Sequence, residues 1–288
     1  MDNAGVLYLV ATPIGNLEDM TFRAVRILKE ADLIAAEDTR GSIKLLNHFE
    51  IRTPMTSYHE YNKVSKAKTL VEQLLAGKNV ACVTDAGTPG ISDPGEVLVR
   101  MALEAGIRVV PVPGACAAVN ALISSGQETG RFCFEAFLPA DKKERAQVLE
   151  ELKEETRTIV LYEAPHRLKR TLQLLLDTLG DRPLSICREL TKKHEEIRMT
   201  TLLQASSFYE ENEPRGEYVL VIAGRDRREL TARKQEAVRE SMTLEEHMQQ
   251  YLDGGMDRKE AMKAVARDRG MTKRDVYAQL LEKPGETG

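Results

Sequence analysis

The chain has 288 residues, a length that slightly favours two medium-sized domains over one large core. Hydrophobic residues make up 42%, charged residues make up 30%, and the formal net charge is -4, as in an ordinary folded protein. A wholly basic nucleic-acid coat protein is therefore excluded, although a local basic patch is not. Because Trp is absent and aromatic residues make up only 5%, the composition also argues against an aromatic platform for stacking bases.

The sequence offers no membrane anchor and no obvious metal site. No stretch approaches the roughly 18 to 20 apolar residues that cross a bilayer. The apolar start at 6–11 is interrupted by Pro13 and follows no basic residue, unlike a signal peptide. The 4 cysteines form no C-x-x-C pair, so buried reduced thiols are expected rather than zinc ligands or disulfides. These features predict a cytoplasmic protein without a metal.

The first part of the chain alternates short apolar runs with longer stretches of helical periodicity, which predicts an α/β fold. The expected strands are 6–11, 33–36, 80–84 and 109–112. The expected helices are 20–31, 42–49, 64–75, 94–105 and 114–123. An N-terminal α/β domain is expected over residues 1–113, with a boundary at the Pro113-Gly114 break.

The second part repeats this rhythm and predicts a C-terminal α/β domain over residues 114–224. Its expected strands are 132–138, 158–162, 184–187 and 216–223. Its expected helices are 144–155 and 168–179.

The composition changes after Gly224. Residues 225–243 are dense in charge and poor in apolar residues, which predicts a solvated linker, in part helical. Three short helical patterns follow, separated by glycines, and predict a helix-turn-helix-like module over residues 244–282. Between Asp257 and Arg274 there are 7 basic and 3 acidic residues, so the module carries a local basic excess.

The most unusual segment is the Gly- and Pro-rich loop Thr84–Gly95, between a predicted strand and a predicted helix. Ligands in open α/β sheets lie at such strand ends, and glycines let the backbone approach them. The loop has no lysine for phosphate, and Asp85 and Asp93 would repel one, so it is neither a Walker A nor a dinucleotide loop. Its acidity suits a cationic cofactor such as S-adenosylmethionine. An ordinary turn before a capped helix is the alternative.

Two other loops could belong to the same site. Ala11–Asp19 follows the first strand, and a structural turn explains it as well as a binding loop does. Pro111–Ala118 places small residues at a helix start. Such small side chains would let a flat ligand such as adenine bind there, but they would equally allow the helix to pack closely on the sheet.

Taken in order, these and three further motifs resemble the tetrapyrrole methylase superfamily. Within it, the chain is similar to the branch that methylates cytidine 2′-hydroxyls of 16S ribosomal RNA, over essentially its whole length. The segments that carry the resemblance are Val10–Leu17, Glu37–Arg40, Asp85–Gly95, Pro113-Gly114, Tyr162–Arg167 and Arg188–Lys192.

The resemblance implies two α/β domains with S-adenosylmethionine in the cleft between them, a homodimer, and cytidine 1402 of 16S rRNA in the small ribosomal subunit as target. Ala11 and Thr12 stand where many members have glycines. Thr88 replaces the family's Asp, for which Asp85 is a candidate substitute. The cofactor-binding residues that the resemblance implies are Pro13, Asp85, Ala86, Gly87, Thr88, Ile91, Ser92, Cys116, Ala117, Tyr162, Leu190 and Val219.

Methyl transfer to a ribose hydroxyl needs an aligned oxygen and a group that removes its proton, but no metal. Glu163, His166 and Asp85 are the favoured catalytic candidates, the first two because polar groups converge after a predicted strand there. A cap or an ion-pair partner is the alternative role for each. The remaining candidate bases are Asp38, His59, Glu60, Glu189 and Lys192.

Basic side chains near the predicted cleft and in the C-terminal module are candidates for phosphate contacts. Near the cleft these are Arg40, Arg167 and Arg188. In the module they are Arg258, Lys259, Lys263, Arg267, Arg269, Lys273 and Arg274, for which a solvated amphipathic bundle is the alternative.

Three other functions stay open at this point. The chain could methylate a tetrapyrrole precursor, although a small-molecule enzyme does not need a basic helical extension. It could methylate a protein in the diphthamide pathway, which uses the same fold. It could also be a non-catalytic RNA-binding module, which would show no heat on titration with S-adenosylmethionine.

Overall fold

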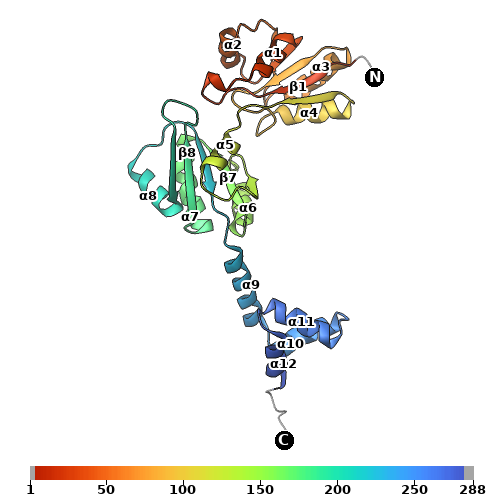
Figure 1. Cartoon of the computed structure of the whole chain (residues 1–288), viewed down its shortest axis with the longest axis vertical. Helices are drawn as coiled ribbons and strands as arrows, with labels where there is room; N and C mark the ends of the chain where they lie inside the picture. The colour runs from red at the N-terminus through yellow and green to blue at the C-terminus, as the bar shows by residue number, and fades with distance from the viewer. Residues whose placement is uncertain (1–3, 282–288) are drawn as a thin grey trace. The chain divides into compact units, whose positions relative to one another are not determined.

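The computed structural model describes residues 4–281, which fall into two units, 1–224 and 225–288. The first unit contains two five-stranded sheets (Figure 1). Residues 1–3 and residue 282, which belong to the expected first domain and the expected module, lie outside the described residues.

The first sheet is wholly parallel, with the strand order β3-β2-β4-β1-β5. β4 is buried along its whole length, which explains its unbroken apolar sequence. The strands are β1 (Val6–Val10), β2 (Leu33–Ala36), β3 (Met55–Ser57), β4 (Val80–Val83) and β5 (Arg108–Val112).

Helices cover both faces of this sheet. On one face, Ala24, Ile27 and Leu28 of α1 and Leu46 of α2 pack on the strands. On the other face, apolar residues of α3 and α4 form a second cluster with β1 and β4. The helices are α1 (Phe22–Glu30), α2 (Thr39–His48), α3 (Lys63–Leu75) and α4 (Gly95–Glu104), and a 3-10 turn, η1 (Leu17–Asp19), precedes α1.

The second sheet is mixed, with the order β6-β7-β10-β8-β9. β6 runs parallel to β7, whereas β10 is antiparallel to both of its neighbours and β9 is antiparallel to β8. The strands are β6 (Phe132–Phe134), β7 (Thr158–Glu163), β8 (Pro183–Arg188), β9 (Glu196–Thr201) and β10 (Tyr218–Ile222).

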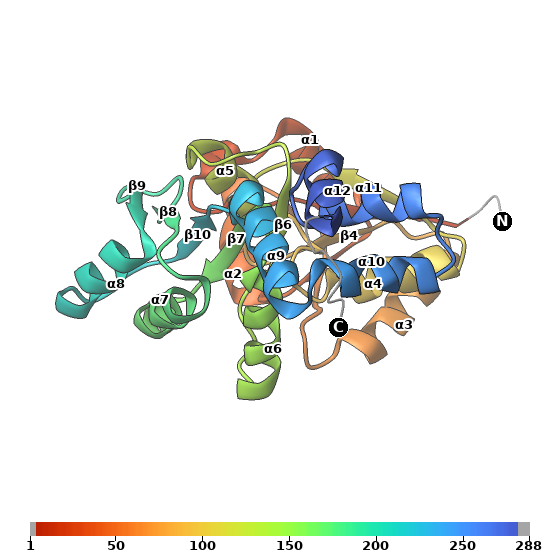
Figure 2. The same ribbon diagram turned by 90° about the horizontal axis from the view of Figure 1, so that it is seen from below.

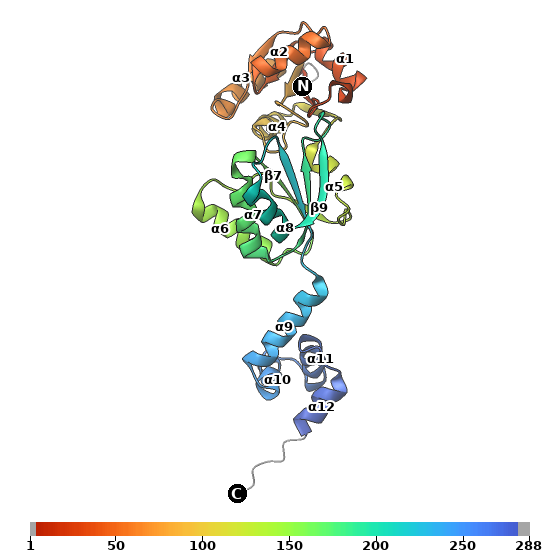
Figure 3. The same ribbon diagram turned by 90° about the vertical axis from the view of Figure 1, so that its left-hand side faces the viewer.

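One face of the second sheet carries three helices and the other carries α5 (Figures 2 and 3). α5 is the next element after β5 in sequence, but it packs on β7 and β10 of the second sheet. The chain therefore passes from the first sheet to the second between residues 112 and 117. The helices are α5 (Ala117–Ser124), α6 (Lys142–Lys153), α7 (Pro165–Leu179) and α8 (Leu202–Glu211).

The structure adds two strands, β3 and β9, and one α-helix, α8, that the sequence patterns missed. β3 has only 3 residues and no buried one, so it leaves no apolar run. β9 is an edge strand in which Glu196 and Arg198 alternate with exposed Ile197 and Met199, a weak strand signal. The expected strand 132–138 is also shorter, because β6 ends at Phe134.

The second unit consists of four helices with a small core of its own. The helices are α9 (Arg227–Ser241), α10 (Leu244–Asp253), α11 (Arg258–Asp268) and α12 (Lys273–Leu281). Leu244 and Met248 of α10 pack against Ala261 and Val265 of α11 and Val276 of α12. Three short helices thus bury a common face, as the glycine-separated patterns predict.

The expected linker is mostly the helix α9, and side chains tie it to the other helices of its unit. Arg239 Nε donates to the carbonyl of Arg269 (2.8 Å), and Gln235 Nε2 donates to that of Arg267 (3.3 Å). Because both acceptors lie at the end of α11, α9 is part of the helical unit rather than a separate linker.

Among residues 4–281, no helix is both long and apolar enough to cross a membrane. Over the same residues, no group of three or more His, Cys, Asp or Glu side chains is placed to hold a metal ion.

Candidate active site

The loops that follow β1 and β4 meet at the carboxyl edge of the first sheet. Helices α1 and α4 leave these neighbouring strands toward opposite faces, which opens a crevice of the kind that holds ligands in α/β sheets. The Thr12 amide donates to the Gly87 carbonyl (2.9 Å), and the Gly87 amide donates to the Thr12 carbonyl (3.1 Å). The two loops are thereby joined into one floor.

The loop between β4 and α4 is held in shape by its own polar groups. The Gly90 amide lies 2.8 Å from both carboxylate oxygens of Asp93, and the Gly95 amide donates to Oδ1 of Asp93 at 2.7 Å. Thr88 Oγ1 donates to the carbonyl of Ala115 at 2.9 Å and joins the loop to the segment before α5. Asp93 is therefore a loop-shaping residue as well as an acidic one.

Gly87 takes a backbone conformation that few other residues adopt, with φ at +84°. An added Cβ would lie 3.2 Å from Cγ2 of Ile14 and 3.4 Å from the carbonyl oxygen of Ala115. The turn and the close approach of the neighbouring loops both favour glycine here.

The second sheet supplies the opposite wall through α5 and β7. The hydroxyl of Tyr162 accepts a hydrogen bond from the Ala118 amide (3.1 Å) and so satisfies a donor at the start of α5. The rings of Phe134 and Phe137 pack on Tyr162, with centroids 4.9 and 5.7 Å away. Burial raises the pKa of Tyr162 to about 12, so the hydroxyl stays protonated and neutral at physiological pH.

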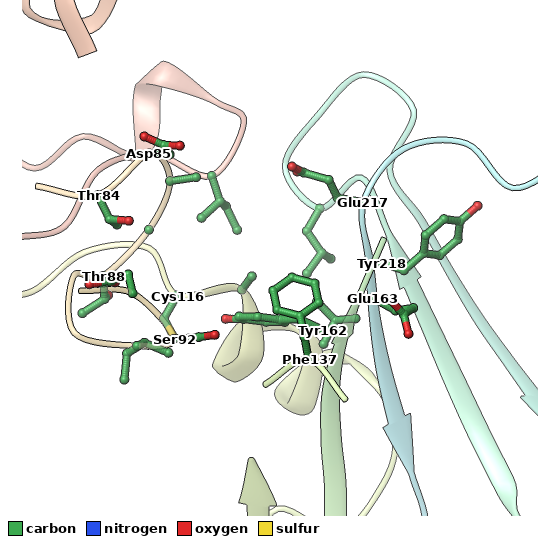
Figure 4. Close-up of a pocket in the computed structure, with 18 of the residues that line it drawn as sticks. Thr84, Asp85, Thr88, Ser92, Cys116, Phe137, Tyr162, Glu163, Glu217 and Tyr218 are labelled. Atoms are coloured by element: carbon green, nitrogen blue, oxygen red, sulfur yellow. The ribbon is translucent and has the colours of Figure 1, made fainter. Parts of the chain in front are cut away.

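These segments enclose a cleft of about 490 Å³, within the roughly 300–1,000 Å³ usual for small-molecule sites. Figure 4 shows Thr84, Asp85, Thr88 and Ser92 on one side and Phe137, Tyr162, Glu163 and Glu217 on the other. The lining residues are Ile14, Glu37, Thr84, Asp85, Ala86, Gly87, Thr88, Ile91, Ser92, Asp93, Cys116, Ala117, Phe137, Tyr162, Glu163, Ala164, Pro165, Cys187, Leu190, Glu217, Tyr218 and Val219.

The charge of this lining is entirely negative. Among the described residues that line the cleft there are carboxylates but no Lys, Arg or His. Such a wall repels phosphate and favours a ligand that carries positive charge. The carboxylates are Glu37, Asp85, Asp93, Glu163 and Glu217.

Glu37 is a half-buried carboxylate at the end of β2. Its Oε2 accepts a hydrogen bond from Thr84 Oγ1 at 2.7 Å. Burial raises the pKa of Glu37, and the charges of Asp85 and Asp93 raise it further, although the Thr84 hydrogen bond works in the opposite direction. A carboxyl group with a raised pKa is a better proton acceptor than an ordinary one.

Glu163, by contrast, already has protein partners on both oxygens. Oε1 accepts from the Ala164 amide (2.8 Å) and lies 3.5 Å from Arg167 Nε, while Oε2 accepts from Thr171 Oγ1 (2.5 Å). The residue is only 2% exposed. These contacts support a structural role at the start of α7. His166 is exposed and does not line the cleft.

Most of the expected cofactor residues come together around the cleft. Pro13 does not line it, although its neighbour Ile14 does. Asp85 is exposed, and its Oδ1 accepts from the Asp38 amide at 2.8 Å. The expected residues that line the cleft are Asp85, Ala86, Gly87, Thr88, Ile91, Ser92, Cys116, Ala117, Tyr162, Leu190 and Val219.

All three arginines expected near the cleft have partners within the chain. Arg167 Nη2 donates to the carbonyl of Leu138 (2.5 Å), in addition to its contact with Glu163. Arg188 Nε donates to the carbonyl of Arg215 (2.8 Å). Arg40 Nε lies 3.5 Å from Oδ1 of Asp38, but 93% of the Arg40 side chain is exposed, against 29% for each of the other two arginines.

In the C-terminal unit, Arg258, Lys259, Lys263 and Arg274 are exposed and Lys273 is half-buried. Arg269 differs, because only 6% of it is exposed and its guanidinium donates to the carbonyls of Met242 (2.6 Å) and Thr243 (2.7 Å). The expectation that Arg269 contacts phosphate is therefore wrong.

Sequence reasoning missed Glu37, Phe137 and Glu217 as lining residues. Glu37 could have been predicted, because it directly follows the buried strand β2 of the parallel sheet, just as the ligand loop directly follows β4. Phe137 and Glu217 carried none, because they come from loops at the ends of β6 and β10 whose positions depend on the mixed sheet.

Several residues near the cleft adopt left-handed backbone conformations, which are uncommon outside glycine. They include Ser92 (φ 65°), Glu189 (φ 50°) and Thr191 (φ 66°). Ser92 lines the cleft, and the other two flank Leu190, which also lines it. Strain of about 1–3 kcal/mol per residue is kept mainly where the geometry serves function.

Comparison with known proteins agrees with this site. The family of tetrapyrrole (corrin/porphyrin) methylases matches residues 6–206. "Ribosomal RNA small subunit methyltransferase I" of Halalkalibacterium halodurans is 52% identical and covers 96% of this chain and 94% of its own. The protein of the same name from Bacillus subtilis is 49% identical and covers 95% and 93%.

A solved structure shows the same fold at lower identity. It is uroporphyrin-III C-methyl transferase from Thermus thermophilus complexed with S-adenyl homocysteine, which is 21% identical with a TM-score of 0.55 and covers 76% of this chain and 97% of its own. The chain therefore belongs to the tetrapyrrole (corrin/porphyrin) methylases, in the branch of the proteins named ribosomal RNA small subunit methyltransferase I.

Proposed function

We propose that this protein transfers a methyl group from S-adenosylmethionine to a ribose 2′-hydroxyl of small-subunit ribosomal RNA, at cytidine 1402. The observation that carries the chemistry is the cleft at the sheet switch point, lined by carboxylates and by no basic side chain among its described residues. The choice of RNA as substrate is supported by the names of relatives about half identical over nearly the whole chain.

The residues of the cleft fit S-adenosylmethionine. This cofactor supplies a methyl group on a sulfonium and also carries an ammonium, so it matches an acidic wall. Gly87 leaves room where the two floor loops approach each other, and Cys116 and Ala117 present small side chains at the start of α5. A bound phosphate or dinucleotide would instead meet a lining whose charged side chains, among the described residues, are all acidic.

Because the leaving group is already good, the protein must mainly align the ribose oxygen and accept its proton. Glu37 is the carboxylate best suited to accept it. Glu163 and Asp93 already take part in several internal hydrogen bonds, and Glu217 forms an ion pair with Lys192 (2.7 Å). Asp85 is the remaining alternative, and its exposure favours a role in attracting the cationic cofactor.

The test of this function is methyl-label transfer to small ribosomal subunits and, in parallel, to naked 16S rRNA, with the modified nucleotide then mapped. A tetrapyrrole precursor serves as the competing substrate. Label on the ribose of cytidine 1402 is the expected result. Label on the tetrapyrrole alone, or on neither substrate despite cofactor binding, would contradict the proposal.

The C-terminal unit is proposed to bind RNA through exposed basic residues of α11 and α12. Removing residues 225–288 should leave S-adenosylmethionine affinity unchanged, because every residue that lines the cleft lies before them. Subunit methylation should fall. The slope of log affinity against log salt should become shallower by about 0.7 to 0.9 for each phosphate that the shortened protein no longer neutralises. Full activity with an unchanged slope would leave the unit as a solvated helical bundle.

The active form is proposed to be a homodimer that works in the cytoplasm, where its ribosomal substrate lies. Support for the dimer comes from the family resemblance. Exposed apolar residues of the helix α5 (Val119 and Ile123) and of the edge strand β9 (Ile197 and Met199) offer a surface for it. Light scattering should give twice the mass of one chain at working concentration. A single-chain mass across the concentration range would refute the dimer.

A further inference from the structure

The loop between β3 and α3 stands beside the cleft. β2, β3 and β4 are parallel neighbours, so the loops that follow them share one edge of the sheet. Tyr58 opens the loop and is 1% exposed. Its amide donates to the carbonyl of Ala36 (2.8 Å) and its hydroxyl to that of Pro94 (2.7 Å). Ala36 and Pro94 directly adjoin the lining residues Glu37 and Asp93.

Short-range contacts also hold the tip of this loop. The His59 amide donates to Oδ1 of Asn62 (2.8 Å), and Nδ2 of Asn62 lies 3.4 Å from the carbonyl oxygen of Ser57. Lys63 pairs with Glu60 across the tip at 2.5 Å. Hydrogen bonds and an ion pair between residues before and after Tyr61 thus fix the conformation of the loop.

Tyr61 itself is held out in solvent, with 97% of its surface exposed. Its only ring contact among the described residues is an edge contact with His59, at a centroid distance of 6.1 Å. A well-anchored loop that displays a whole aromatic ring next to an active site presents a stacking surface.

The chain segments on either side of Tyr61 have a basic excess, unlike the lining of the cleft. Residues 38–68 contain six Lys or Arg and three Asp or Glu, although the whole chain has a net charge of -4. Arg40 lies at the start of α2, the helix that follows the neighbouring strand β2. It pairs with Asp38 at 3.5 Å, and 93% of its side chain is exposed. Phosphates are therefore repelled from the cleft lining but attracted to this neighbouring surface.

We propose that Tyr61 and Arg40 hold single-stranded RNA beside the methylated nucleotide, with a base stacked on the Tyr61 ring and a phosphate near the Arg40 guanidinium. Sequence-specific RNA recognition commonly uses unpaired bases on aromatic rings. One exposed ring at the right place thus provides the stacking that the low aromatic content of the chain argued against. This inference rests on the proposed function.

The test compares Tyr61→Ala, Tyr61→Phe and Phe22→Ala in the full chain. Phe22 is the matched control because it is 99% exposed but opens α1, which packs on the opposite face of the sheet from α3, the helix that follows the Tyr61 loop. Tyr61→Ala should raise the KM for small subunits about tenfold, as the loss of about 1.4 kcal/mol of stacking implies, and should leave kcat at saturation and S-adenosylmethionine affinity unchanged. Tyr61→Phe and Phe22→Ala should behave like the wild type.

A second measurement separates this proposal from the proposed function. Fluorescence anisotropy of the full chain with a fluorescein-labelled single-stranded RNA needs no methyl transfer. Tyr61→Ala should weaken this binding, and Arg40→Gln should weaken it and flatten its salt dependence by the equivalent of about one phosphate. Equal weakening in Phe22→Ala, or unchanged binding in either Tyr61→Ala or Arg40→Gln, would overturn the proposal. If the protein methylates no RNA but Tyr61→Ala and Arg40→Gln still weaken RNA binding as expected, the result would count against the methyl-transfer function alone.

Discussion

Replacing Glu37 with Gln is expected to lower the rate of methyl transfer by about 100-fold or more, because a positioned general base contributes about 10²- to 10⁴-fold. The amide keeps the size of the side chain and can still accept the Thr84 hydrogen bond, but it cannot take a proton. Titration calorimetry should show nearly unchanged S-adenosylmethionine affinity, and single-turnover assays should locate the loss in the chemical step.

Asp38→Asn is the matched control for this variant, since Asp38 adjoins Glu37 but does not line the cleft. It should retain most of the activity. A large loss of cofactor affinity in Glu37→Gln with an unchanged rate at saturation would instead assign Glu37 to cofactor binding.

The same residue should set the acid limb of the pH–rate profile. Burial, Asp85 and Asp93 raise the pKa of Glu37, so activity should be lost as pH falls through a value above the ordinary one for Glu. Removing the Asp85 charge with Asp85→Asn should lower that pKa and move the limb to lower pH. Thr84→Val, which removes a hydrogen bond that lowers the pKa, should move the limb to higher pH. A limb that stays in place in both variants would show that another group titrates.

The second large effect is expected for Gly87→Val, which should weaken S-adenosylmethionine binding by about tenfold or more while the protein still folds. The new side chain begins 3.2 Å from Ile14 Cγ2 and 3.4 Å from the carbonyl oxygen of Ala115, at the floor of the cleft. It also takes a left-handed conformation at a cost of about 1–3 kcal/mol, which appears in the thermal midpoint.

Gly90→Val separates the steric effect of a new side chain in the cleft from the cost of the left-handed backbone conformation. Gly90 has nearly the same backbone angle, φ +88°, but an added Cβ meets nothing within 4 Å, and the residue does not line the cleft. Both variants should lose similar stability, whereas only Gly87→Val should lose cofactor affinity. Equal affinities in two folded variants would mean that Gly87 is needed only for the turn.

Elements with strong internal patterns were predictable from the sequence. β2, β4 and β10 are short apolar runs that are buried almost throughout. β2 has the expected bounds, and β4 and β10 lie within the expected strands 80–84 and 216–223. α9 could not be recognised as part of the helical unit, because none of its residues is buried. It is held by Arg239 and Gln235, whose hydrogen bonds to α11 leave no periodic pattern.

The part of the site that is formed by backbone turns was predictable from the sequence. The glycines and prolines of the loop after β4 indicate a ligand loop, and the structure places this loop in the cleft. Individual side chains were not predictable in the same way. Glu163 ends β7 and Glu37 directly follows β2. Only their hydrogen-bond partners distinguish the carboxylate held by Thr171 and Ala164 from the one that accepts a hydrogen bond from Thr84.

Because α9 packs against α11, the basic helices α11 and α12 are not carried on a flexible linker when they bind RNA. Only residues 223–226 lie between β10 and α9 without regular structure, instead of the long stretch that a disordered linker would provide. Because α9, about 22 Å long, belongs to the same unit as α11 and α12, the basic residues of these helices would reach RNA together as one body and not as points on a random chain.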